Sequence, residues 1–220
     1  MIKHRAVITG IGMVTPLGVG RETFWANACA GRSGIRRIQS FDPSSFRTQI
    51  GGECREFDPL TVVDKDDLRR MDRVLLLAAA AADEALKDSA ISPNEDRTGV
   101  MIGTGMGGVA TCDQQYENMC KKGPRWVNPM TILMCMHNAA AGFISMRHGL
   151  RGPSLTVSTA CASGAHAIGE AYQAIKYGHA HAMVAGGTEA ALSPGVFTAW
   201  NALRVMATLN ENPTRASRPF

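Results

Sequence analysis

Short apolar runs rich in β-branched residues alternate along this chain with longer segments of helical hydrophobic periodicity. Four such runs predict strands, over residues 5–9, 98–102, 155–157 and 182–185. A further short strand is expected within residues 50–57. The helical segments predict helices over residues 21–30, 74–86, 109–119 and 162–177, and one helix or a pair of helices over residues 129–148.

This alternation of strands and helices indicates an α/β protein in which helices cover a buried sheet. Asp72 stands just before the apolar helix that starts near Val74, where an aspartate is a favoured N-cap. No linker or low-complexity segment separates independent domains. Residues 1–220 are therefore expected to form one unit.

The composition, 45% hydrophobic and 19% charged, is that of a globular protein and excludes several other classes. The longest apolar run, residues 74–82, is too short to span a membrane. No signal peptide is expected, because Lys3, His4 and Arg5 lead directly into the first strand. The net charge of +4 is too small and too dispersed for a nucleic-acid-binding protein, although an acidic protein partner is compatible with it.

The six cysteines show no CxxC spacing, and the histidines show no ligand pattern with acidic partners apart from His179 and His181, which stand beside a turn and are interpreted as exposed. We therefore expect no metal site and no cofactor, and a reducing compartment, the cytoplasm. Five of the cysteines are interpreted as small apolar residues that fill helices or strands.

Two glycine clusters follow predicted strands and invite a nucleotide-binding interpretation. In the first, Gly10 and Gly12 are followed by Thr15 where a dinucleotide fingerprint has its third glycine. The second, residues 103–108, has no Gly-Lys-Ser/Thr sequence for a phosphate loop. Both clusters are better explained by close contact between backbone segments.

Cys161 stands among small residues at the point where the strand 155–157 gives way to the helix 162–177. A cysteine in the first turn of a helix meets unpaired backbone N–H groups and the helix dipole, which favour a thiolate. That position suits a nucleophile and supplies an N–H for a developing oxyanion. The alternative is a buried structural cysteine, which is the commoner role of a lone cysteine.

The cysteine helix has one apolar face, formed by Cys161, Ala165, Ile168, Tyr172 and Ile175. We expect this face, and Cys161 with it, to point into the protein. His166 comes five positions later, about 140° away around the helix, which is a poor place for a base acting on the sulfur. His166 is therefore interpreted as structural.

Taken together, these features resemble the β-ketoacyl-acyl-carrier-protein synthases of the thiolase superfamily, and most closely their type II condensing enzymes of fatty-acid synthesis. The matching stretches run in family order along the whole chain, at residues 7–12, 15–18, 149–153, 158–164, 184–189 and 217–220. The resemblance implies a thiolase-like layered α/β/α fold, of which this chain is the N-terminal half of a duplicated core.

The resemblance also implies an acyltransferase. Cys161 would take an acyl group from acyl-carrier protein as a thioester, and its backbone N–H would form half of the oxyanion hole. A decarboxylative Claisen condensation with malonyl-carrier protein would then lengthen the chain by two carbons. Met106 would gate the acyl pocket and Trp200 would form part of its wall. Basic residues would dock the acidic carrier protein, namely Arg69, Arg70, Arg125 and Arg204, and the enzyme would be a homodimer.

The chain departs from the family pattern in one large respect. The family's second half carries two catalytic histidines, a lysine and a phenylalanine of the oxyanion hole, and this sequence stops at Phe220, where that half is expected to begin. These 220 residues alone are therefore expected to be inactive. Two alternatives to a fatty-acid enzyme stay open: a polyketide ketosynthase, or an inactive truncated module that binds carrier protein or dimerises.

Overall fold

A computed structural model describes residues 4–90 and 94–218. The chain divides into two compact units, both discontinuous in sequence. The first unit contains Met1–Gly12, Pro59–Gly108 and Asn128–Ala190, and the second contains Met13–Asp58, Val109–Val127 and Ala191–Phe220. Each unit is described by itself below. The expectation that residues 1–220 form a single unit stays a prediction.

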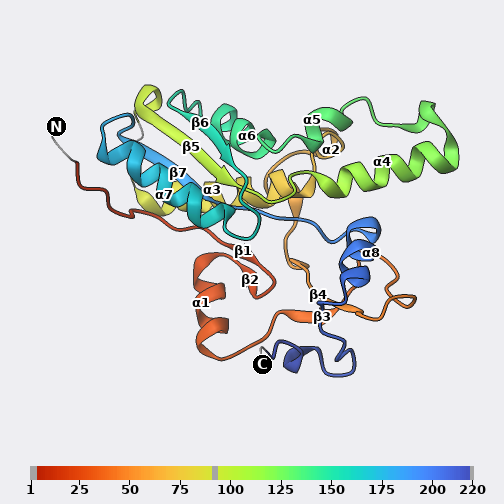
Figure 1. Ribbon diagram of the computed structural model, residues 1–220. Coiled ribbons are helices and arrows are strands. Elements are labelled where there is room, and N and C mark those ends of the chain that lie inside the picture. The colour runs from red at the N-terminus through yellow and green to blue at the C-terminus, as the bar shows by residue number, and fades with distance from the viewer. Residues whose placement is uncertain (1–3, 91–93, 219–220) are drawn as a thin grey trace. The chain divides into compact units, whose positions relative to one another are not determined.

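A three-stranded parallel sheet forms the centre of the first unit (Figure 1). Strand β5 (Thr98–Gly103) lies between β6 (Ser154–Val157) and β7 (Ala182–Gly187). All six residues of β5 are buried, as expected for the central strand of a sheet with both faces covered. The three strands predicted for this part of the chain are thus confirmed, with ends shifted by one or two residues.

Helices cover both faces of this sheet. Helix α7 (Ser163–Lys176) packs Ala167 and Ala171 against Met101 of β5. Successive side chains of a strand point to opposite faces, so Val100 and Ile102 face the other side, where α3 (Arg73–Ser89) and α6 (Ala139–Arg147) contact the sheet. The layered α/β/α arrangement predicted from the sequence is therefore present in the first unit.

Helix α3 begins as the sequence predicts, because the Asp72 carboxylate accepts a hydrogen bond from the Val74 N–H at 2.8 Å. Its Asp83 forms a bidentate ion pair with Arg147 of α6, at 2.8–3.2 Å, which links the two helices.

The segment 129–148, predicted as one helix or a pair of helices, contains two helices, α6 and the shorter α5 (Thr131–Cys135). The first unit also has α2 (Lys65–Leu68), η1 (Pro59–Thr61) and η2 (Glu95–Arg97).

The strand predicted at residues 5–9 is wrong for this structure. Residues 4–13 run without strand pairing to any described residue, and the side chains of Val7 and Ile8 are 69% and 82% exposed. A strand requires a hydrogen-bonded neighbour, and an apolar run alone does not supply one. Instead the segment is held by its glycines: a Cβ added at Gly10 or Gly12 would lie 2.1 or 1.9 Å from a backbone oxygen of α3. The interpretation of this glycine cluster as a close backbone contact is confirmed.

The described part of the second unit contains two antiparallel strand pairs and three α-helices. Strand β1 (Val14–Thr15) pairs with β2 (Gly18–Val19), and β3 (Ile35–Arg37) pairs with β4 (Ile50–Gly52). The rings of Phe41, Phe46 and Phe197 pack edge to face, with centroids 5.3–6.0 Å apart. Its helical elements are α1 (Arg21–Cys29), α4 (Val109–Lys122), η3 (Pro124–Trp126), α8 (Pro194–Leu203) and η4 (Pro213–Arg215).

In the described part of the chain, no helix is both long enough and apolar enough to cross a bilayer.

The Glu53 carboxylate accepts several hydrogen bonds within the second unit, and these make the stability of the fold depend on pH. Burial of the carboxylate raises its pKa, but hydrogen bonds from Ser40, Arg55 and Gln39 outweigh burial and lower the pKa overall. A carboxyl whose pKa is lower in the folded state stabilises the fold above its ordinary pKa and loses that contribution as the pH falls. We expect Glu53→Gln to lower the unfolding free energy by about 1 kcal/mol at pH 7. Denaturant unfolding at several pH values should show this difference disappearing in acid, and a difference independent of pH would contradict this role.

Candidate active site

Cys161 lies in a tight turn between β6 and α7. The strand ends at Val157, and α7 begins at Ser163 after its N-cap, Ala162. The sequence placed the cysteine in the first helical turn, and the structure puts it one residue before the N-cap. Its thiol is free and exposed. The residue before it, Ala160, has a left-handed backbone with φ +52°, a conformation that is costly for alanine and points the chain sharply into the helix.

The buried Ser163 hydroxyl stabilises this turn through two hydrogen bonds. It accepts a hydrogen bond from the Thr159 N–H at 2.8 Å and donates one to the Ala160 carbonyl at 2.6 Å. Ser163 is only 3% exposed, so its buried hydroxyl takes both of its hydrogen-bond partners from the protein. One buried hydroxyl thus bridges the residues that precede Cys161. The sequence analysis did not assign Ser163 this role.

Glycines at the ends of two strands let the start of α7 lie directly on the sheet. A Cβ added at Gly103 of β5 would lie 2.2 Å from the backbone carbonyl of Ser163, and one at Gly187 of β7 would lie 2.8 Å from the Cα of Gly164. Real Cβ atoms do not approach backbone so closely, so these positions require glycine. The interpretation of the glycines at residues 103–108 as sites of backbone contact is confirmed at Gly103.

Adding a methyl group at Gly103 should therefore displace the turn that carries Cys161. We expect Gly103→Ala to destabilise the protein by about 1–3 kcal/mol, the range for overpacking a filled site. Gly186→Ala is the matched control, because Gly186 neighbours Gly187 on β7 and a Cβ there would meet nothing within 4 Å. Thermal unfolding should show a lower melting temperature for Gly103→Ala only; equal melting temperatures would contradict the close contact.

The predicted orientation of α7 is wrong. The face with Cys161, Ala165 and Ile168 was expected to point inward, yet all three residues are exposed, as is Tyr172 on the same face, and Ile175 is half-buried. The buried face is instead a row of small residues at a spacing of four, Ser163, Ala167 and Ala171. Small side chains occupy the buried face of α7 because only small side chains allow the helix to lie close to the glycines of the sheet. In this structure Cys161 is exposed, whereas a structural cysteine was expected to be buried.

His166 contacts the turn and not the sulfur. Its Nδ1 lies 2.7 Å from the Thr159 hydroxyl, two residues before Cys161. No hydrogen bond joins the Cys161 sulfur to an acid or base among the described residues. The Thr159 hydroxyl is therefore the hydrogen-bond partner of His166, which fits a structural role. None of the described hydrogen bonds in this turn brings a base to the Cys161 sulfur.

The loop that carries Met106 is held next to the cysteine turn by Glu189. The Glu189 carboxylate accepts hydrogen bonds from the N–H groups of Gly105, at 2.8 Å, and Met106, at 3.2 Å. A Cβ at Gly105 would lie 3.7 Å from the Cα of Ala160, so this loop and the turn are neighbours. Met106 itself is 38% exposed. Sequence reasoning missed Glu189, although an acidic residue two positions after a strand that ends in glycine was a visible signal.

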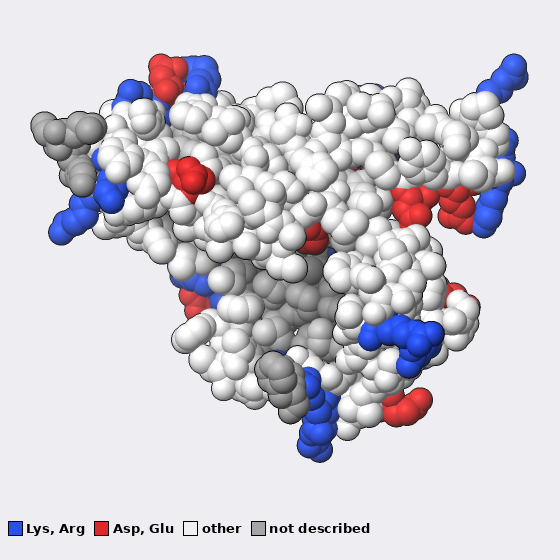
Figure 2. Space-filling view, in the orientation of Figure 1, with Lys and Arg blue, Asp and Glu red and all other residues white. Residues whose placement is uncertain are grey.

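The remaining predicted site residues are exposed and divided between the units. Arg69 and Arg70 follow α2 in the first unit, where the Arg69 carbonyl accepts a hydrogen bond from Asn128. In the second unit, Arg125 lies in η3, Arg204 ends α8 and Trp200, 44% exposed, lies on α8. On the face in Figure 2, basic side chains form small separate groups, several of them beside acidic ones.

Comparisons with known proteins match this chain to ketosynthases. A family model described as "Beta-ketoacyl synthase, N-terminal domain" matches residues 3–220. The C-terminal residues 219–220 of the predicted motifs lie outside the described residues. The chain is 41% identical over 223 residues to a 3-oxoacyl-acyl-carrier-protein synthase 2 of Coxiella burnetii, and equally to one of Vibrio cholerae, covering 100% of this chain and 54% of each relative. It therefore spans about half the length of these curated relatives.

Solved structures give the same result for the fold. A β-ketoacyl synthase from Burkholderia phymatum superposes with a TM-score of 0.83 at 32% identity, over 97% of this chain and 53% of that one. A complex of a type II polyketide acyl-carrier protein with its ketosynthase, AntDE:AntF, gives a TM-score of 0.81 at 27% identity, over 94% and 50% of the two chains. The predicted thiolase-like fold is confirmed.

Proposed function

This chain belongs to the β-ketoacyl synthase family, and we propose that it is the acyl-accepting, N-terminal half of a 3-oxoacyl-acyl-carrier-protein synthase of type II. The observation that carries the proposal is the exposed Cys161 in a turn fixed by Ser163 and by glycines of the sheet. Such a turn presents a sulfur to a substrate while holding its backbone still, which is what a nucleophile requires.

In the proposed reaction, the Cys161 thiolate attacks the thioester carbonyl of an acyl-carrier protein. A new sulfur–carbon bond forms, the bond to the carrier's sulfur breaks, and the carrier leaves as a thiol after taking a proton. The Cys161 backbone N–H would stabilise the oxyanion of the tetrahedral intermediate. Malonyl-carrier protein would then lose carbon dioxide, and its carbanion would attack the enzyme thioester and release a 3-oxoacyl product. The groups that assist decarboxylation are not among the contacts of Cys161.

Met106 and Trp200 are proposed to shape the acyl pocket. The loop contact between Gly105 and Ala160 supports Met106, because it brings the Met106 loop to the cysteine turn. Glu189 fixes the backbone of that loop through hydrogen bonds from the Gly105 and Met106 N–H groups. Support for Trp200 is its exposed aromatic side chain on α8.

The proposed partners are acyl-carrier protein and a second copy of this chain, with the reaction in the cytoplasm. All four docking arginines are exposed, and the AntDE:AntF neighbour is a ketosynthase bound to its carrier protein. For the homodimer, the support is an exposed apolar group in the first unit, with Leu155 on edge strand β6 and Ile168 and Tyr172 on α7 between 44% and 56% exposed.

The condensation is tested with the natively expressed protein, acyl-carrier protein and malonyl-carrier protein. Mass spectrometry of the carrier-bound product should show a 3-oxoacyl chain two carbons longer than the acyl substrate. Absence of this product, with both substrates intact, would contradict the proposed reaction.

A polyketide ketosynthase is the second candidate, favoured by the likeness to AntDE:AntF. Repeated extension without reduction, giving a polyketone, would select it.

Charge reversal at α2 tests carrier-protein docking separately. We expect the double variant Arg69→Glu/Arg70→Glu to weaken carrier-protein binding at least tenfold, because two cations become anions on the exposed end of α2. Isothermal titration with acyl-carrier protein measures the effect, and Arg32→Glu/Arg36→Glu in the second unit is a control with the same change of charge. An equal loss in both double variants would show a general charge effect in place of a docking surface. Binding that depends on Arg69 and Arg70, without any condensation, would instead identify an inactive carrier-binding module.

A further inference from the structure

The Met106 loop, residues 104–108 after β5, is fixed at both of its ends. At its start, the Thr104 N–H donates a hydrogen bond to the carbonyl of the last residue of β6, at 3.1 Å. At its other end, a Cβ added at Gly108 would lie 2.1 Å from the Met134 carbonyl oxygen, so the loop backbone lies directly against α5. The loop is therefore attached both to the strand that leads into the cysteine turn and to a helix.

Glu189 holds the middle of this loop. One of its carboxylate oxygens accepts hydrogen bonds from the N–H groups of Gly105, at 2.8 Å, and Met106, at 3.2 Å. Its other oxygen accepts a hydrogen bond from the Thr104 hydroxyl at 3.4 Å, and that hydroxyl in turn accepts one from the Gly107 N–H at 3.1 Å. Hydrogen bonds to an ionised acceptor are stronger than those between neutral groups. A single carboxylate thus orients the consecutive N–H groups on both sides of the methionine side chain, directly or through Thr104.

Loss of this carboxylate should leave the fold intact. Glu189 and Met106 are exposed and Gly105 is half-buried, so the freed N–H groups can bond to water. Thr104, in contrast, is only 2% exposed and keeps its hydrogen bonds to the backbone. The contact therefore determines where the methionine backbone lies, while the two ends of the loop stay attached without it.

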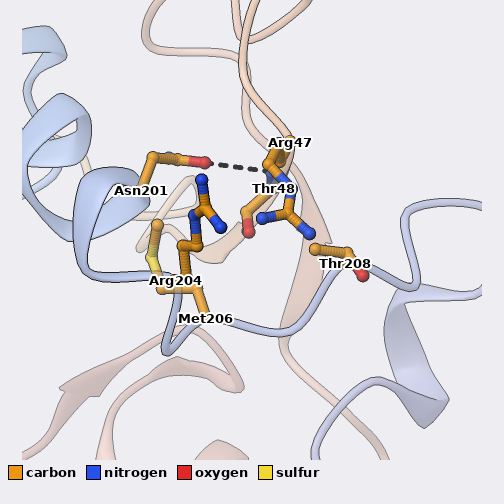
Figure 3. Close-up of a pocket in the computed structure, with 6 residues that line it drawn as sticks. All are labelled: Arg47, Thr48, Asn201, Arg204, Met206 and Thr208. Carbon is orange, nitrogen blue, oxygen red and sulfur yellow. Dashed lines mark hydrogen bonds between the residues drawn. The ribbon is translucent and has the colours of Figure 1, made fainter.

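Trp200, the other residue proposed for the acyl pocket, has a separate support. Its neighbour on α8, Asn201, accepts a hydrogen bond from the Thr48 N–H at 3.2 Å (Figure 3). Both of these residues belong to the second unit, whereas Glu189 and the Met106 loop belong to the first. A change at Glu189 therefore acts on the methionine and leaves this support of Trp200 in place.

We propose that Glu189 is a positioning residue that sets the acyl-chain-length preference at Cys161 by fixing the backbone of Met106. The inference rests on the proposed function, in which the methionine gates the acyl pocket. The loop lies beside the cysteine turn, where a Cβ at Gly105 would be 3.7 Å from the Cα of Ala160. A short acyl group ends near the sulfur, whereas a long chain must continue past the gate. A displacement of about 1 Å in a positioning group is enough to slow a reaction by about a hundredfold.

Acylation of the natively expressed protein by butyryl-carrier protein and by dodecanoyl-carrier protein tests this role. The butyryl rate reports the reactivity of Cys161, and the dodecanoyl rate depends in addition on the gate. We expect Glu189→Ala to lower the ratio of dodecanoyl to butyryl kcat/KM about tenfold. Glu189→Gln should keep this ratio within about twofold of the unaltered protein, because its amide oxygen can still accept both N–H groups.

Glu170→Ala is the matched control. It removes an exposed carboxylate from α7 in the same unit, and Glu170 has no hydrogen bond to the Met106 loop. Its ratio should equal that of the unaltered protein. Circular dichroism of each variant checks that it is folded, and general damage to the cysteine turn would lower both rates together without changing the ratio.

The proposal is overturned by an unchanged or increased ratio in Glu189→Ala, by a loss in Glu189→Gln as large as in Glu189→Ala, or by an equal loss in Glu170→Ala. Failure of the inference is distinguishable from failure of the proposed function. If the unaltered protein takes an acyl group from both carriers and the ratio does not respond to Glu189, only the inference fails. If the unaltered protein takes an acyl group from neither carrier, the proposed function fails, and the inference fails with it.

Discussion

Replacing Cys161 with alanine is expected to abolish acyl transfer to the protein and to reduce condensation by about a thousandfold or more, because the proposed reaction passes through a thioester on the Cys161 sulfur. The side chain is exposed and makes no hydrogen bond to a described residue, so its loss should leave the fold intact. The protein is incubated with acyl-carrier protein, the reaction is quenched at set times, and mass spectrometry gives the acylated fraction. The melting temperatures of Cys161→Ala and the unaltered protein should agree closely.

Cys29→Ala is the matched control for this experiment. Cys29 is also a free, exposed cysteine, but it lies on α1 in the second unit, away from the strand–turn–helix that holds Cys161. It should acylate and condense like the unaltered protein. Wild-type elongation by Cys161→Ala, or loss of acylation in Cys29→Ala, would show that the nucleophile has been assigned to the wrong residue.

Removing the Ser163 hydroxyl is expected to give the second largest effect on acyl transfer. Ser163→Ala removes the acceptor of the Thr159 N–H and one of the two donors to the Ala160 carbonyl, which keeps its hydrogen bond from the Ser163 backbone N–H at 3.1 Å. Each hydrogen bond contributes about 0.5–1.5 kcal/mol to the folded turn, and if the turn relaxes after losing two of them, Cys161 moves with it. We therefore expect acylation of Cys161 to slow by about 10- to 100-fold.

Ser158→Ala is the control for the serine variant. Ser158 is in the same turn, but it is exposed and its hydroxyl has no hydrogen bond to a described residue. Acylation rates at saturating acyl-carrier protein, measured well below the melting temperature of each variant, separate positioning from stability. Equal rates for Ser163→Ala and the unaltered protein would mean that the hydroxyl does not position the nucleophile.

Local sequence patterns predicted the elements whose causes are themselves local. The strands at residues 98–102 and 182–185 were predictable because their apolar runs are bounded by glycine or polar residues. Asp72 was recognisable as a cap from its position before Val74. The place of Cys161 between a strand and a helix was likewise found to within one residue, because both neighbours have clear periodicity.

The errors came from features that depend on distant contacts. The helix face with Ile168 and Tyr172 is the more hydrophobic one, yet small residues lie on the sheet because Gly103 and Gly187 demand a close approach. The run at residues 5–9 has strand-like composition without a strand beside it in the described structure. The contact of Glu189 with the Met106 loop joins residues more than 80 positions apart, which periodicity cannot reveal.

The role of Cys161 is tested most directly by the intact mass of the natively expressed protein before and after incubation with acyl-carrier protein. We expect a mass increase of one acyl group, which disappears in Cys161→Ala and persists in Cys29→Ala. A protein whose mass does not change, although it is folded and binds the carrier protein, would contradict the assignment of Cys161 as the acyl acceptor.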